Sequence, residues 1–310
     1  MNKLRTSLLL LVLLVISISN SCKKNPSTNP PKANFIISPD FGTTITQFTF
    51  DASSCNDKED GNENLMVSWD FDGDGNWDTD FETSKTSVHH FDLSGDFSAR
   101  LLVADSDGNK DSTKVLLKVG DPEIGSFTDP RDIQKYKIVK IGEQTWFAQN
   151  LNYASGNGTF CYQDQGINCS QYGKLYFYAV AKSACPEGWH LPDEDEWKQM
   201  EMVLGMTKEE ADIVGWCGTD QGKQMKAIAG WSLNGNGTNS SGFDAFPGGF
   251  RFFDGPSFEE LGYQGYWWTS TDVGDEMIMA RQISNKSEQV RHLPIYQYDA
   301  LSVRCVKNAD

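Results

Sequence analysis

Four carboxylates surround a glycine turn between Ser68 and Asp78, in the spacing D-x-D-x-D-G-x-x-D. They are Asp70, Asp72, Asp74 and Asp78, and the turn glycine is Gly75. Oxygen ligands on alternate residues of a tight loop converge on one hard cation, and calcium takes about six to eight oxygens. Glycine tolerates the left-handed backbone of such a turn. The spacing therefore predicts calcium, against the alternative of an acidic turn without an ion.

An EF-hand is not the expected frame for this loop. Counted from Asp70, the twelfth position is Phe81, where an EF-hand requires a bidentate glutamate. No long helical pattern flanks the loop, and no nucleophile or general base is spaced around it. We expect a structural calcium site and not a catalytic one.

The N-terminal residues have the pattern of an export signal. Lys3 and Arg5 precede an apolar run, Leu8–Ile18, that is too short to span a bilayer. Ser19–Cys22 resembles a bacterial lipobox, with a polar Asn20 where a small residue is commoner. We expect a signal peptide over residues 1–21, acylation of Cys22 and a flexible tether over residues 22–33. The alternative is an ordinary secretory peptide.

An acylated cysteine anchors a protein to a membrane, so the expected location is the cell envelope, in the outer membrane. Lys23 and Lys24 follow Cys22 without an acidic run, and the sequence leaves the membrane face open. The net charge of −16 argues against nucleic acid as a partner. Seven cysteines in an exported chain indicate disulfides, with six remaining after Cys22.

The 310 residues suffice for two domains. Short strand-like segments separated by turns fill residues 34–119, without a helical pattern. They are Asn34–Ile37, Gln47–Phe50, Met66–Phe71, Ser87–Phe91, Phe97–Val103 and Lys114–Val119. In the fifth segment, apolar residues alternate with Ser98 and Arg100, which is typical of a half-buried antiparallel strand. This pattern predicts an all-β sandwich.

The same segment resembles the polycystic kidney disease (PKD) domain, which is immunoglobulin-like. The matching motifs are Phe50–Ser53, Trp69–Phe71, His89–Phe91, Gly95–Phe97 and Val103–Gly108. Asp72 is an insertion into the usual W-D-F-G-D-G motif and completes the calcium-type spacing. The resemblance implies a spacer or a binding accessory, with His89 and His90 as packing residues of a strand.

A second domain is expected over residues 131–308, behind a linker of turn-forming residues over 120–130. Ile138–Ile141 and Thr145–Phe147 predict a hairpin, and Tyr172–Ala184 has helical spacing. Asp193 with Glu196 predicts a capped helix, and Thr207 with Glu210 repeats the signal.

This domain resembles the Fibrobacter succinogenes major paralogous domain of exported bacterial proteins. The matching motifs are Gln144–Tyr153, Tyr172–Tyr176, Ala184–Pro192, Gly248–Arg251, Tyr266–Thr271 and Ser302–Lys307. The resemblance implies an α+β fold related to C-type lectins. It also implies disulfides between Cys185 and Cys305 and between Cys161 and Cys169. For Cys55 and Cys217 the sequence leaves three possibilities open: free thiols, a disulfide between the two, or disulfides between molecules.

Lectin-like folds place a long variable loop where this sequence has the Gly/Asn-rich segment Gly230–Gly249. The candidate ligand-binding residues there and beyond it are Asn234, Asn236, Asn239, Asp244 and Trp268. Amide groups hydrogen-bond sugar hydroxyls, and an exposed ring stacks on the sugar face. Since Trp267 and Trp268 adjoin on a strand, we expect one to face inward and the other outward. The alternative is a solvated loop without a ligand.

No phosphate-binding, serine-hydrolase or zinc-protease motif occurs in the sequence. The expected function is therefore non-catalytic: a lipid-anchored envelope protein whose second domain binds a glycan or a protein. One alternative is a structural component of a surface assembly. Another comes from formylglycine-generating relatives, which share the Leu191–Trp197 helix start and Arg304-Cys305 and need a reactive cysteine pair near copper.

Overall fold

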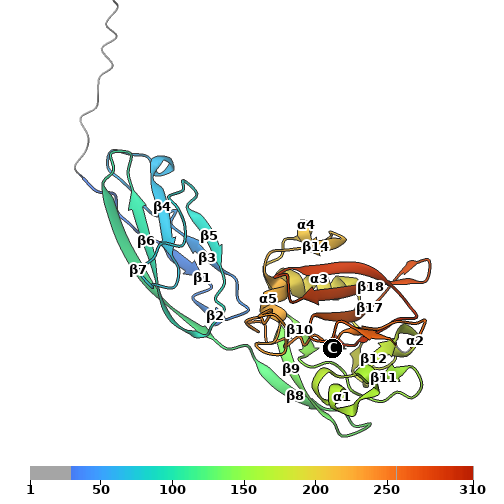
Figure 1. Ribbon diagram of the computed structural model, residues 1–310. Coiled ribbons are helices and arrows are strands. Elements are labelled where there is room, and N and C mark those ends of the chain that lie inside the picture. The colour runs from blue at the N-terminus through green and yellow to red at the C-terminus, as the bar shows by residue number, and fades with distance from the viewer. Residues whose placement is uncertain (1–28, 256, 310) are drawn as a thin grey trace, which may run out of the picture.

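The computed structural model describes residues 29–255 and 257–309 (Figure 1). The predicted signal peptide and Cys22 lie outside these residues. Within this described part, every helix is too short or too polar to cross a bilayer.

The first domain consists of two β-sheets packed face to face. One sheet has the order β1 (Ile36–Ser38), β3 (Phe48–Asp51), β5 (Thr86–His89). The other has the order β2 (Phe41–Thr43), β7 (Lys110–Gly120), β6 (Gly95–Ala104), β4 (Met66–Asp70), with the short 3₁₀ helix η1 (Asn62–Asn64) before β4. The strands predicted from the sequence are present, and β2, which pairs in parallel with β7, is an addition.

The core of this sandwich follows the alternation seen in the sequence. Ala99, Leu101 and Val103 on β6 are fully buried, whereas Ser98 and Arg100 between them are half-buried. Aromatic rings from both sheets fill the space between them, and the ring of Trp69 lies edge-on to Phe50 with centroids 5.6 Å apart. Edge-to-face contacts of this kind add to the stability that burial alone provides.

The second domain contains two further sheets (Figure 1). The five-stranded sheet has the order β13 (Trp189–His190), β21 (Val306–Lys307), β10 (Gln144–Phe147), β9 (Lys135–Ile141), β8 (Ile124–Thr128). The larger sheet has the order β11 (Thr159–Phe160), β12 (Leu175–Phe177), β20 (Ala300–Ser302), β17 (Gln264–Gly274), β18 (Met277–Ser284), β19 (Val290–Tyr296), β14 (Gly215–Cys217). The short strands β15 (Phe250–Arg251) and β16 (Phe258–Glu259) join it beside β20.

Short helices connect these strands. They are η2 (Tyr162–Asp164), α1 (Gly166–Tyr172), α2 (Tyr178–Ala181), α3 (Glu194–Val203), α4 (Lys208–Ala211) and α5 (Gln221–Met225). The two predicted capping boxes are confirmed: Asp193 with Glu196 begins α3, and Thr207 with Glu210 begins α4. Each pair satisfies backbone N–H groups that have no partner inside the helix.

Two sequence predictions in this domain are wrong. The expected helix over Tyr172–Ala184 is interrupted by β12, because Gly173 ends α1 in a left-handed conformation (φ 75°) where an added Cβ would lie 2.7 Å from Asn150 Cβ. The expected linker contains β8, whose residues pair with β9 and whose Phe127 packs on the core. Tertiary pairing overrides the turn-like composition of residues 120–130.

The two domains touch each other directly. The hydroxyl of Thr44 donates to the backbone carbonyl of Ser240 at 2.6 Å, and Ile45 packs against the core of the second domain. His90 Nε2 lies 3.2 Å from Asp220 Oδ2, across the interface, and 3.7 Å from Asp92 Oδ1. Hydrogen bonds to Asp220 and then to Asp92 raise the pKa of His90 to about 9.

This interface predicts a loss of stability in mild alkali. A raised pKa in the folded chain means that His90 stabilises fully below its unfolded pKa of about 6.5 and loses this contribution as the pH rises through about 9. The side chain is 30% exposed, so solvent screening reduces the effect to about 1 kcal/mol. Melting temperatures of wild type and His90→Gln, measured from pH 6.5 to 9.5, should converge as the pH rises. A difference in melting temperature between wild type and His90→Gln that stays the same at every pH would contradict this prediction.

Candidate functional site

Trp267 and Trp268 are both fully buried, so the prediction of an exposed Trp268 is wrong. They do face opposite sides of β17, as neighbours on a strand must. Trp267 joins a core cluster with Trp146 and Trp197, whereas Trp268 joins another with Tyr176. The sheet is covered on both faces, and no ring of this pair is free to stack on a sugar.

The Gly/Asn-rich loop uses most of its predicted ligand-binding groups internally. Asn236 Oδ1 accepts from the backbone N–H of Trp231 at 3.0 Å, and Asn239 Oδ1 accepts from that of Asp244 at 2.8 Å. Burial raises the pKa of Asp244. Asn234 and Asn236 are both exposed, but the side-chain oxygen of Asn236 already accepts the bond from Trp231. The predicted sugar site is therefore not assembled.

Arg304 and Asn150, both from family motifs, hold this loop to the core. The Arg304 guanidinium donates to the carbonyls of Phe147 and Asp244, each at 2.9 Å, and to Asn150 Oδ1 at 2.8 Å. Trp267 Nε1 donates to the same Asn150 oxygen at 2.8 Å. These residues are fixed parts of the fold and not a ligand platform.

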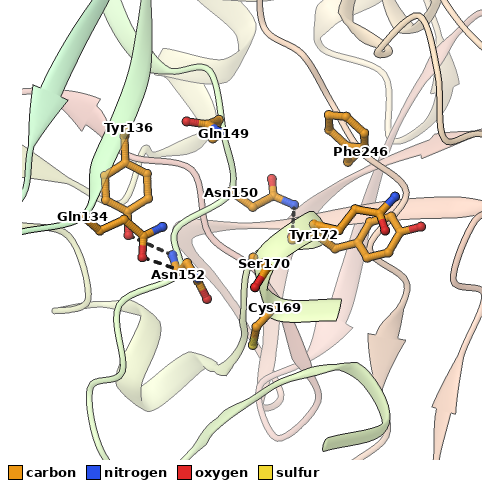
Figure 2. Close-up of a pocket in the computed structure, with 11 residues that line it drawn as sticks. Gln134, Tyr136, Gln149, Asn150, Asn152, Cys169, Ser170, Tyr172 and Phe246 are labelled. Atoms are coloured by element: carbon orange, nitrogen blue, oxygen red, sulfur yellow. Dashed lines mark hydrogen bonds between the residues drawn. The ribbon is translucent and has the colours of Figure 1, made fainter. Parts of the chain in front are cut away.

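A polar pocket of about 50 Å³ lies beside Asn150 (Figure 2). Figure 2 shows Gln134 and Asn152 on one side and Tyr172 on the other, where the carbonyl of Tyr172 accepts from Asn150 at 2.8 Å. Asn152 Oδ1 is buried there, and no protein group donates to it. Since a water molecule occupies about 30 Å³, the pocket has room for one or two waters and is too small for a sugar ring.

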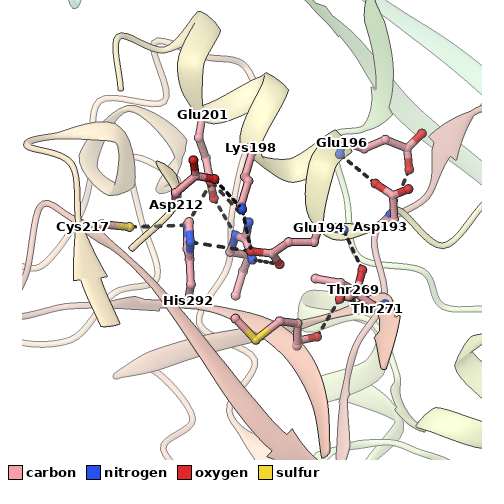
Figure 3. A network of polar contacts seen from close by, with 12 residues as sticks. Asp193, Glu194, Glu196, Lys198, Glu201, Asp212, Cys217, Thr269, Thr271 and His292 are labelled. Atoms are coloured by element: carbon pink, nitrogen blue, oxygen red, sulfur yellow. Dashed lines mark hydrogen bonds and ion pairs between the residues drawn. The ribbon is translucent and has the colours of Figure 1, made fainter. Parts of the chain in front are cut away.

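A buried charge network underlies α3 (Figure 3). Arg281, on β18, is fully buried; it donates to Glu201 at 2.7 Å and to Glu194 at 2.6 Å. His292, on β19, lies 3.0 Å from Glu201 Oε2. Glu194 lies in the first turn of α3 and Glu201 near its C-terminal end. No sequence pattern connected either acid with Arg281.

One thiol–imidazole pair adjoins this network, and the sequence analysis missed it. Cys217 Sγ lies 3.4 Å from His292 Nε2 because β14 pairs with β19 (Figure 3). The thiol is only 2% exposed. Burial, followed by the nearby Glu201, raises the pKa of Cys217 to about 12. The thiolate is the nucleophilic form of cysteine, so this burial makes Cys217 less reactive than a free thiol.

The acidic loop brings together three of its four predicted calcium ligands. Oxygens of Asp70, Asp72 and Asp78 lie within 4.8 Å of one another, and this is the one such group in the described chain. Asp74 is outside it and accepts from the backbone of Asn76 instead. Asp70 is buried and also pairs with Arg100 at 3.1 Å, a partner that the sequence analysis did not anticipate.

The carboxylates of this loop repel one another. Burial raises the pKa of Asp78, and the neighbouring Asp72, Asp70 and Asp74 act in the same direction. Asp70 Oδ1 accepts only one backbone hydrogen bond, from Gly73, which leaves an oxygen lone pair for a cation. The three residues thus offer carboxylate oxygens, the donor type that calcium prefers, and two of them are exposed.

The disulfides implied by the family resemblance are present. Cys185 is bonded to Cys305 and Cys161 to Cys169. Cys55 and Cys217 are free and buried, and they lie in different domains. No cysteine in the described residues therefore offers an exposed thiol.

Comparison with known proteins agrees with the two resemblances. A model of the PKD domain matches residues 28–118, and a model of the Fibrobacter succinogenes major domain matches residues 139–307. A search of curated proteins gave no match.

Two solved structures are similar to parts of the chain. One comes from work on the promiscuous specificity of carbohydrate-binding modules of the β-sandwich superfamily; it is 22% identical, with 40% of this chain and 57% of that chain covered and a TM-score of 0.27. The other is the PKD1 domain of Vibrio anguillarum Epp; it is 22% identical, with 30% of this chain and 98% of that chain covered and a TM-score of 0.24. Because residues 139–307 exceed half of the sequence, the chain belongs to the family of the Fibrobacter succinogenes major domain.

Proposed function

We propose that the chain is a lipid-anchored protein of the cell envelope whose PKD domain holds a non-catalytic recognition domain away from the membrane. The recognition domain binds a glycan or an envelope protein. The observation that carries this proposal is the arrangement in Figure 1: the blue start of the described chain and the second domain lie at opposite ends of the PKD sandwich. A chain that is anchored just before residue 29 would present the second domain outward.

The state of the cysteines supports binding over oxidase chemistry. Formylglycine-generating relatives need a reactive cysteine pair, whereas Cys305 is fully buried and bonded to Cys185. Cys217 is buried, and burial raises the pKa of its thiol. We include in the proposal a C-type-lectin-like α+β architecture for residues 131–308, which the packing of α3 against β17 supports.

The test of this choice is an assay of the purified chain with copper, oxygen and cysteine-containing peptides. We expect no loss of peptide thiol beyond that in a protein-free control. Copper-dependent turnover that disappears in Cys305→Ser would overturn the non-catalytic part of the proposal.

The anchor is tested separately by metabolic labelling. Acylation requires the Cys22 thiol, so cells fed an alkyne fatty acid should label the wild type and not Cys22→Ala. Cys55→Ala serves as the matched control and should label like the wild type. Equal labelling of Cys22→Ala would rule out the lipid anchor. If the anchor is confirmed, protease treatment of intact cells reports which membrane face carries the chain.

Calcium forms a further part of the proposal. At a free calcium concentration of about one hundred times Kd, binding should stabilise the PKD domain by about 2.7 kcal/mol. The ion relieves the repulsion among Asp70, Asp72 and Asp78. For the wild-type full chain, the denaturation midpoint in calcium should be higher than the midpoint in chelator. Asp80→Ala, which removes an exposed acid outside the cluster, should show the same difference. Asp72→Ala should abolish the difference, and a wild type that ignores calcium would refute the site.

A further inference from the structure

Three exposed aromatic rings lie against one another at one edge of the second domain. Phe253, Tyr296 and Tyr298 are 54%, 42% and 45% exposed. The rings of Phe253 and Tyr296 are nearly parallel, with centroids 5.7 Å apart and planes at 17°. Tyr298 lies 6.1 Å from Tyr296. We call these three residues the aromatic platform.

The platform differs from the other exposed rings of the described residues. Phe41, Trp77, Trp216 and Tyr263 are also at least 38% exposed. None of these four has a second aromatic ring in contact within the described chain, and single exposed rings are normal on protein surfaces. A group of three is different, since contiguous exposed apolar area marks an interaction site.

Backbone hydrogen bonds fix the platform before any ligand arrives. Asp299, which is 8% exposed, accepts from the backbone N–H of Phe253 at 3.1 Å and donates its own N–H to the carbonyl of Tyr296. The N–H of Gln297 donates to the carbonyl of Glu276 at 2.9 Å. Three separate segments are therefore tied together. A pre-organised site loses little conformational entropy on binding.

A depression of about 300 Å³ adjoins the rings. It is lined by Phe177, Ala179, Phe253, Gln297 and Tyr298. Hydrogen-bonding groups stand at its border: Gln297 contributes an amide, and the hydroxyl of Tyr298 donates to Glu276 Oε1 at 2.9 Å. This volume is at the lower end for small-molecule sites. Two platform rings, Phe253 and Tyr298, line the depression with their planes tilted by 52°, and polar groups stand at its edge.

The size of the platform favours a small ligand over a protein. An aromatic side chain buries about 150–250 Å², so three half-exposed rings offer roughly 300 Å². A stable protein interface needs about 800 Å² per partner. The polarised C–H groups on one face of a pyranose ring suit the negative face of an aromatic ring, and its hydroxyls suit the amide and phenol at the border.

The charges near the platform favour a neutral ligand. The carboxylate of Glu276 accepts from Tyr298, and Asp254 follows Phe253 directly. Arg251, which precedes Phe253 by two residues, is packed over the rings of Phe160 and Phe177 at 4.3 and 5.5 Å. Two acids beside one stacked guanidinium disfavour an anionic sugar.

We propose that the aromatic platform binds the pyranose rings of a neutral oligosaccharide. This inference rests on the proposed function, because it names the ligand class and the site of the recognition domain. It replaces the loop Gly230–Gly249 and Trp268 as the sugar-binding surface.

Isothermal titration of the purified full chain tests the inference. The probes are cellohexaose, xylohexaose and mannohexaose, with hexagalacturonate as the anionic comparison. We expect at least one neutral probe to bind with Kd on the order of 10 μM to 1 mM. Since each substitution removes a ring that contacts the ligand, Phe253→Ala or Tyr296→Ala should weaken binding roughly tenfold or more.

Two variants provide controls. Tyr263→Ala removes an equally exposed ring outside the platform and should change the affinity less than about twofold. Tyr298→Phe keeps the ring and removes the hydroxyl, so it should weaken binding less than Tyr296→Ala. Melting temperatures of all variants should match the wild type, since the platform rings are exposed.

Each contrary outcome is decisive. Unchanged affinity in the double variant Phe253→Ala, Tyr296→Ala would overturn the inference while leaving the proposed recognition role intact. Tighter binding of hexagalacturonate than of every neutral probe would overturn the ligand class. No heat with any probe up to about 10 mM would reject the site, and binding of an envelope protein by the same sample would then show that the recognition role survives it.

Discussion

Replacing Cys185 and Cys305 together with alanine should lower the free energy of unfolding of the second domain by about 4–5 kcal/mol. The bond joins residues 120 apart in sequence, from the segment after α2 to the residue just before the last strand, β21. In the chain-entropy model, a longer closed loop removes more freedom from the unfolded chain. Chemical denaturation followed by tryptophan fluorescence measures the difference.

The second disulfide of the same domain is the matched control. Cys161 and Cys169 are only eight residues apart, so their replacement should cost about 2–3 kcal/mol. A double variant of Cys185 and Cys305 that is no less stable than the variant of the local pair would contradict the prediction. It would mean that buried packing around Cys305, and not loop closure, determines the stability of this region.

Glu201→Gln should destabilise the second domain by about 3–5 kcal/mol, because it removes one charge from a buried ion pair. Glu201 and Arg281 are both fully buried, and His292 contacts the same carboxylate. Burial acts to raise the pKa of Glu201, but Arg281 and then His292 outweigh it, so the net pKa is lowered. Equilibrium denaturation at pH 7 gives the difference.

The pH dependence of the stability difference and a substitution in a surface ion pair complete this test. A lowered carboxyl pKa contributes stability above the unfolded pKa of about 4.5 and loses it as the pH falls through the folded value. The gap between wild type and Glu201→Gln should therefore narrow in acid. Glu288→Gln removes an acid that is 61% exposed beside Lys223 and should cost less than about 1 kcal/mol. Equal effects of the two substitutions would contradict the role of burial.

Local sequence patterns predicted much of the fold. The capping boxes at Asp193 and Thr207 depend on residues three positions apart, and the structure confirms both. The alternation along Phe97–Val103 likewise reports which face of β6 is buried. Such signals are readable because the residues that interact are neighbours in sequence.

What the sequence could not reveal depends on partners far away in the chain. Tryptophan is a residue type that often occurs in binding sites. Trp268 is seen to be a core residue only because both faces of β17 are covered. Cys217 meets His292 across 75 residues through strand pairing. A linker-like segment becomes β8 because β9 offers it an edge.

The candidate binding surface illustrates the same limit. Phe253 follows β15, Tyr296 is the last residue of β19, and Tyr298 lies just beyond it. No sequence motif marks these two segments, and Asp299 joins them by its bond to the backbone of Phe253. The family motifs, in contrast, turn out to build the core around Asn150 and Arg304. Motif residues identified the family, whereas the exposed platform lies outside those motifs.

The most direct test of a recognition role is binding of the purified full chain to an array of glycans and immobilised envelope proteins. Each bound ligand is then recovered, and its mass is measured by mass spectrometry. The prediction is saturable binding to at least one glycan or protein, with Kd on the order of micromolar to millimolar, and recovery of the ligand chemically unchanged. A ligand recovered cleaved or oxidised, or an array without any saturable binding, would contradict it.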